Sequence, residues 1–185
     1  VIGPAEEPID LATLRLWCKV DSDEEDDTLI ALGLAARQHI EAYTGTRLFT
    51  QTVRMRWSCF EDRMRLPVAP VQEISAVEYL DADGATQTLD PAVYETSLRG
   101  LRPVIGRAFG QCWPVLRPSI EAVTVTAVVG YGTISDIPEP VRLALRMLCA
   151  QWFDNRMPIA IGNIVNELPG SVAALLASHR IYLFG

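Results

Sequence analysis

The period of the hydrophobic pattern changes twice along this chain, and that change limits the folds it can adopt. Apolar residues recur every three or four positions in segments 26–43 and 137–156, which is the spacing of amphipathic helices. Segments 50–60, 73–80 and 121–129 alternate or are rich in β-branched residues, as strands are. The sequence therefore predicts an α+β fold, in which N- and C-terminal helices form a bundle with an inserted antiparallel β subdomain.

Polar residues and glycines mark where the predicted helices begin and end. Asp10 is expected to cap a short first helix, and Gly45 to end the helix over 26–43 in a left-handed conformation. Asp136 is expected to cap the helix that runs to about residue 156. Another short helix is expected to begin at Gly170.

The middle of the chain is expected to hold short strands joined by turns. "DADG" at 81–84 predicts a hairpin turn, and 92–97 a short strand. Residues 98–120, rich in proline and glycine, are expected to be irregular.

The stretch "TAVVGYG" at 126–132 admits two interpretations. Val-Gly-Tyr-Gly matches the core of the carbonyl filter of potassium channels, but that filter works only between membrane-spanning helices of ~20 apolar residues. The chain has no such run, because Arg142 and Arg146 interrupt the longest apolar helix, so we predict no membrane partner. We expect Gly130, Tyr131 and Gly132 to form a structural joint between strand and helix. Both glycines can adopt positive φ, and the tyrosine can pack its ring on the core with its hydroxyl in water.

The sequence shows no catalytic, cofactor or metal site. It lacks a nucleophile elbow, a Walker loop and paired metal ligands, and neither His39 nor His179 has a partner at ligand spacing. The four cysteines are expected to be buried thiols rather than a disulfide framework. They are Cys18, Cys59, Cys112 and Cys149. We therefore expect a protein without enzymatic activity and without cofactors.

Charge is segregated along the chain. The net charge is −7, and residues 1–27 contain nine acids and two bases, whereas residues 97–120 contain arginines and no acid. The two segments are candidate complementary faces of a subunit interface. The acidic candidates are Asp21, Asp23, Glu24, Glu25, Asp26 and Asp27, and the basic ones are Arg99, Arg102, Arg107 and Arg117. Because Phe109 and Trp113 lie among these arginines, contact with DNA is a second interpretation, which the acidic pI opposes.

Several short segments, in this order and spacing, resemble the head–tail connector (adaptor) proteins of long-tailed bacteriophages and phage-derived gene transfer agents. They are "LRLWCKVDSDEEDDTLIALGLAARQHIEAYTGTRL" (14–48), "LPVAPVQEISAVEYLDADG" (66–84), "VYETS" (93–97), "CWP" (112–114), "VTVTAVVGYG" (123–132), "IPEPVRLALRMLCAQWFDNR" (137–156) and "LPGSVAALLASHR" (168–180). The arginine-rich composition and long β insertion are most similar to the gene transfer agent version.

The resemblance implies a structural role. Such proteins form a ring, typically of twelve copies, beneath the portal protein at the capsid vertex. They retain packaged DNA, which passes through the ring, and dock a tail-completion or stopper protein. The chain would then be one connector domain over 1–185, with helical parts at about 10–46 and 137–180, a β insertion at about 49–132 and a tail at 181–185. It would lie at the head–tail junction of a virion or gene transfer agent particle assembled in the bacterial cytoplasm.

The end of the chain is a candidate portal-docking tail, because "IYLFG" is apolar where a chain end is ordinarily solvated. The residues of this tail are His179, Arg180, Ile181, Tyr182, Leu183 and Phe184. Two alternative functions remain open at this point. One is a tail terminator or another tail-completion protein, and the other is a DNA-contacting accessory protein that uses the Arg99–Arg117 segment.

Overall fold

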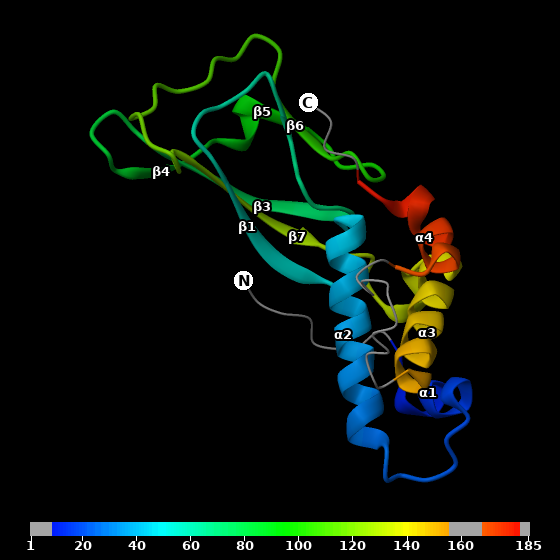
Figure 1. The fold of residues 1–185 in the computed structure, drawn as a ribbon. Coiled ribbons are helices and arrows are strands. Elements are labelled where there is room, and N and C mark those ends of the chain that lie inside the picture. The colour runs from blue at the N-terminus through cyan, green and yellow to red at the C-terminus, as the bar shows by residue number, and fades with distance from the viewer. Residues whose placement is uncertain (1–8, 156–167, 182–185) are drawn as a thin grey trace, which may run out of the picture.

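The computed structural model describes residues 9–155 and 168–181 of the 185-residue chain. Helices gather at one end of the molecule and strands at the other (Figure 1). The helices are α1 (Leu11–Cys18), α2 (Asp26–Thr44), α3 (Glu139–Asp154) and α4 (Gly170–Leu176), with short 3-10 helices η1 (Pro91–Val93), η2 (Ile134–Asp136) and η3 (Ala177–His179). The predicted α+β fold, with a β insertion between two helical parts, is confirmed.

The helical bundle is held together by apolar faces at helical spacing. α2 and α3 pack on each other, with α1 and α4 against α3. The side chains of Leu29 and Ile40 from α2 meet Leu145 and Leu148 from α3 in one buried cluster. Full burial of each such side chain contributes about 1.5–3 kcal/mol to folding. This cluster therefore accounts for much of the stability of the bundle.

The helix ends follow the sequence rules closely, with one exception. Asp10 caps α1 by accepting a 2.7 Å hydrogen bond from the Thr13 backbone N–H, and Gly45 ends α2 with φ of 74°. Asp136 does not cap α3, contrary to the prediction. Its carboxylate accepts hydrogen bonds from the Thr133 backbone N–H and hydroxyl and so closes η2, while Pro138 occupies the N-cap position of α3. The Asp136 carboxylate therefore caps η2, the turn in which it lies, and not the following helix α3.

The β subdomain contains two antiparallel sheets. The larger sheet has the order β1-β7-β3-β4 and the smaller one β2-β6-β5. The strands are β1 (Gln51–Trp57), β2 (Arg63–Arg65), β3 (Val71–Leu80), β4 (Thr86–Thr88), β5 (Tyr94–Ser97), β6 (Val104–Arg107) and β7 (Val123–Val129). β7 is the central strand, and its alternate residues Val123, Val125 and Ala127 are fully buried. A second hydrophobic cluster, separate from that of the helices, lies between these strands.

Two predictions about the β subdomain are wrong. Segment 98–120 is not wholly irregular, because β6 lies within it and pairs with both β2 and β5. Only Ile105 of this strand is buried, so it shows no alternating pattern that the sequence could reveal. The cysteines are not all core residues either, since Cys59 and Cys112 are exposed while Cys18 and Cys149 are buried.

Candidate assembly surfaces

The joint between sheet and bundle is formed by backbone packed on backbone. Gly130 and Gly132 have φ of 115° and 118°, as predicted. A Cβ added to Gly130 would lie 2.1 Å from the Phe49 carbonyl oxygen and 2.8 Å from the Thr50 nitrogen. The two crossings of the chain, entering and leaving the β subdomain, are therefore in direct contact at a site that admits only glycine.

Tyr131 differs from the prediction in one respect. Its ring packs on the helical cluster, but its hydroxyl is buried and has no hydrogen-bond partner rather than reaching water. Burial accordingly raises the pKa of this phenol above its usual value. The Tyr131 N–H donates to the Leu48 carbonyl, so the residue ties the exit of the sheet to its entry.

A buried ion pair at the end of α2 supports the same joint, and the sequence did not reveal it. Arg37 and Glu41 lie 3.3 Å apart, with side chains 8% and 9% exposed. The second carboxylate oxygen of Glu41 accepts a 2.9 Å hydrogen bond from the Leu48 backbone N–H. The pair has the i,i+4 spacing of an ordinary surface pair, and only the fold shows that it is buried.

The acidic segment is only partly available for contacts between molecules. Asp26 is engaged within the chain, because Arg15 donates two hydrogen bonds to its carboxylate, one of 2.7 Å from Nε. These hydrogen bonds lower the pKa of Asp26 and raise that of Arg15. Asp21, Asp23 and Glu24 are exposed in the loop between α1 and α2, at the far end of the bundle from the sheets (Figure 1).

The candidate arginines are divided by the structure into engaged and exposed residues. Arg107 pairs with Asp62 at 3.6 Å, and the Arg117 side chain lies over the turn at Gly84. Arg99 and Arg102 are exposed in the turn between β5 and β6. The acidic loop lies at the end of the bundle remote from the β subdomain, to which the segment with these arginines belongs, so the two do not meet within one copy (Figure 1).

The candidate tail begins with residues that pack on their own chain. The Ile181 backbone N–H donates a 2.7 Å hydrogen bond to the Thr44 carbonyl, and its side chain contacts Gly45. The Arg180 guanidinium lies 4.6 Å from the centre of the Tyr43 ring. His179 ends η3. Tyr182, Leu183 and Phe184 lie outside the described residues.

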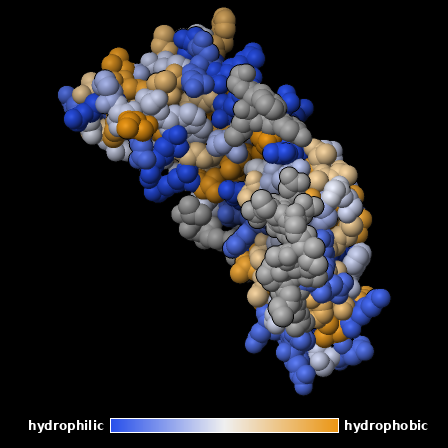
Figure 2. Space-filling model, viewed as in Figure 1, coloured by the Kyte–Doolittle hydropathy of each residue, from blue (hydrophilic) through white to orange (hydrophobic). Residues whose placement is uncertain are grey.

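The loop from 108 to 121 carries the most exposed large apolar side chains, which the sequence did not distinguish from core residues. Phe109, Val115 and Ile120 are 102%, 78% and 88% exposed. Figure 2 shows apolar groups at the surface of this half of the molecule. The loop is attached to the β subdomain through Trp113, which stacks on Phe60 with ring centres 4.5 Å apart. Large apolar side chains exposed along one loop make it a candidate interaction surface.

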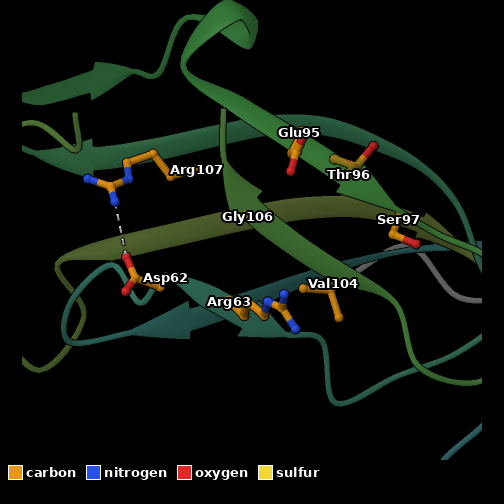
Figure 3. A pocket seen from close by; sticks show the side chains of 8 residues that line it. All are labelled: Asp62, Arg63, Glu95, Thr96, Ser97, Val104, Gly106 and Arg107. Carbon is orange, nitrogen blue, oxygen red and sulfur yellow. Dashed lines mark ion pairs between the residues drawn. The ribbon is translucent and has the colours of Figure 1, made fainter. Parts of the chain in front are cut away.

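A shallow groove of about 660 Å³ lies on the small sheet (Figure 3). Its floor is Gly106, with Arg63 on one side and Glu95 on the other, and the Asp62–Arg107 ion pair closes one end. Its charges balance, and it offers no nucleophile paired with a base. Across residues 9–155 and 168–181, no three His, Cys, Asp or Glu side chains are grouped to hold a metal ion. Within the same residues, no helix has the length and apolar character needed to cross a membrane.

Comparison with known proteins gives a match in structure but not in sequence. No protein-family model and no curated protein matches the chain. A chain in the neck of an empty gene transfer agent (GTA) particle, computed with C6 symmetry, has the same fold with a TM-score of 0.78 and 24% identity. The alignment covers 100% of this chain and 98% of that one.

Two further solved structures agree. A chain in the virion of a native gene transfer agent particle matches with a TM-score of 0.75 and 24% identity, over 100% of this chain and 98% of that one. A chain in the neck of a native GTA particle computed with C12 symmetry matches at 0.70 and 25% identity, over 97% of each chain. The expected resemblance is thereby confirmed at the level of the fold, over nearly the whole chain, with chains of gene transfer agent neck and virion structures.

Proposed function

We propose that this chain is a structural component of the neck of a tailed particle, where it forms a ring at the head–tail junction. One observation carries the proposal: the chain shares its fold, from end to end, with a chain of gene transfer agent necks. The neck structures have C6 and C12 symmetry, which supports a ring of repeated copies. We propose twelve copies, a location in the virion or gene transfer agent particle, and no enzymatic activity.

Within this role, we propose that the ring docks on the portal protein and presents a surface for a tail-completion protein. The exposed loop with Phe109, Val115 and Ile120 is our candidate for the second surface. Its exposed side chains are apolar, and a partner that covered them would gain the free energy of their burial. Packaged DNA would pass through the ring. A tail-terminator function is the alternative within the same class of structural proteins. A terminator would dock elsewhere in the tail and not on the portal.

Portal docking is tested by mixing purified chain with portal rings and measuring the mass of the complex. We expect the full chain to add a stoichiometric ring to the portal and a chain lacking residues 182–185 to bind at least tenfold more weakly. Ile181 is kept because it packs on Thr44 and Gly45 within its own chain. If the shortened chain bound portal rings as well as the full one, the tail would not be the docking element. If the full chain did not bind at all, docking on the portal would be wrong.

The acidic segment is tested by charge reversal. Asp23 and Glu24 are exposed, and their replacement by lysine leaves the Arg15–Asp26 pair intact. If they contact arginines of a neighbouring copy, the double variant should form fewer rings on the portal at low salt, with the difference shrinking as salt screens the charges. The matched control is Glu61→Lys with Glu95→Lys, two exposed acids of the β subdomain that lie outside both the acidic loop and the larger sheet, read for ring formation at the same salt. Unchanged ring assembly by the Asp23 and Glu24 variant would contradict the acidic interface.

A further inference from the structure

The larger sheet has two open edges, which raises the question of what covers them. β1 and β4 are the outer strands, and each pairs on one side only, with β7 and β3 respectively. Among the described residues, no further backbone hydrogen bond reaches the outer side of either strand. Outer strands carry unpaired N–H and C=O groups that can pair with another chain.

The two edges differ in charge. The strand β1 contributes exposed Arg54 and Arg56 and has no acid. The hairpin of β3 and β4 contains Glu78, Asp81, Asp83 and Asp90 and no base between them. Arg56 is partly neutralised by Glu121 at 3.1 Å, and Arg117 lies over the hairpin turn, but the two edges keep opposite net charges.

The strand directions and positions are compatible with pairing between copies. β1, β7, β3 and β4 alternate in direction, so β4 of one copy and β1 of the next would be antiparallel. In register, Glu78 lies opposite Thr88 on β4 and Thr124 on β7, and Thr124 lies opposite Arg56 on β1. β4 is therefore level with the C-terminal end of β1, at Arg56 and Trp57, and neighbours at equal height would bring these segments together.

We propose that the β4 edge of one copy pairs with the β1 edge of the next, so that the larger sheets join into one sheet around the ring. The proposal rests on the proposed function, because it needs neighbouring copies in a closed ring. Joining two different surfaces is the contact that a cyclic assembly requires. Strands spaced about 4.8 Å apart make four strands a step of about 19 Å, and twelve such steps give a circumference of roughly 230 Å, enough for an open centre. Because β4 has three residues, the contact is short, and the opposite charges beside it select the partner.

The contact can be tested by cross-linking in assembled particles. Cys59 and Cys112 are exposed, so both are first replaced by serine to remove competing thiols. Arg56→Cys on β1 is then combined with Thr88→Cys on β4, which lies at the same height, or with Thr86→Cys two residues along. Particles from the producing bacterium are oxidised with a copper–phenanthroline oxidant, which removes two electrons and two protons as one S–S bond forms.

We expect a ladder of disulfide-linked multimers on a non-reducing gel with at least one of these pairs, and only when both cysteines are present. The control pair, Arg56→Cys with Glu95→Cys, places the second thiol at an exposed site on the outer strand of the small sheet and should stay monomeric. A second measurement is charge reversal: Arg54→Glu should lower incorporation into particles at least threefold, and adding Asp83→Arg should restore it.

The outcomes separate this inference from the function on which it rests. If the chain is present in particle necks but neither pair cross-links, or the control pair cross-links equally, the edge contact is wrong and the neck function stands. If the unmodified chain is absent from purified particles, the proposed function fails, and the edge contact fails with it.

Discussion

Replacing Gly130 by alanine is expected to lower the free energy of unfolding by at least about 3 kcal/mol, the largest effect we predict for a single methyl group. The methyl group would lie 2.1 Å from the Phe49 carbonyl oxygen and 2.4 Å from its carbon. Both atoms belong to the backbone, so no side chain can rotate away. A φ of 115° adds strain for any residue with a Cβ. Valine, which adds two more methyl groups, should be worse.

Two other glycines provide graded controls for this prediction. Gly100 has φ of 68° with nothing within 4 Å of an added Cβ, so alanine there should cost only about 1–2 kcal/mol. At Gly132 the added Cβ would lie 2.8 Å from an Asp136 carboxylate oxygen, which can move at the expense of its bonds to Thr133. Urea unfolding followed by circular dichroism should rank the losses Gly130, then Gly132, then Gly100. A Gly130 variant as stable as the Gly100 variant would show that the two crossings are not in contact.

Replacing Glu41 by alanine is the second change with a large expected effect, about 3 kcal/mol lost. The change removes a carboxylate from a buried Arg37 and leaves the Leu48 N–H without its acceptor. The Leu48 N–H becomes a buried donor without an acceptor, and the buried Arg37 loses its ion pair with Glu41. Glutamine keeps an oxygen for the Leu48 N–H and should lose less than alanine does.

The matched control is Glu139→Ala on α3. Glu139 also pairs with arginines on its own helix, Arg142 and Arg146, but its side chain is 59% exposed. Exposed pairs contribute about 0–1 kcal/mol, so this variant should remain close to the unmodified protein. If the Glu41 and Glu139 variants unfolded at the same urea concentration, burial of the Arg37–Glu41 pair would not matter to stability.

The parts of the fold that could be predicted are those with long periodic patterns. α2 and α3 each present an apolar face over sixteen residues or more, and β7 alternates over seven. β6 could not be predicted, because four residues with one buried side chain carry no pattern. Its existence depends on pairing with the preceding strand β5 and with β2, which is distant in sequence.

The candidate surfaces were less predictable than the fold, for a physical reason. Sequence shows which residues are charged or apolar but not which are already engaged within the chain. Asp26 and Arg107 were counted among interface residues, and both have partners in their own molecule. Conversely, Phe109 was considered only as a residue that could stack on a base, and the fold places it wholly in solvent. Only the three-dimensional arrangement separates these cases.

The central claim is that many copies of this chain encircle the head–tail junction, and imaging of the neck tests it most directly. A cryo-electron microscopy reconstruction of particles from the producing bacterium should show this fold repeated in a ring between portal and tail. The reconstruction should also show which chain covers Phe109, Val115 and Ile120, for which we expect a tail-completion protein. A reconstruction in which a different protein forms the ring between portal and tail would contradict the account. Particles that lack this chain would contradict it as well.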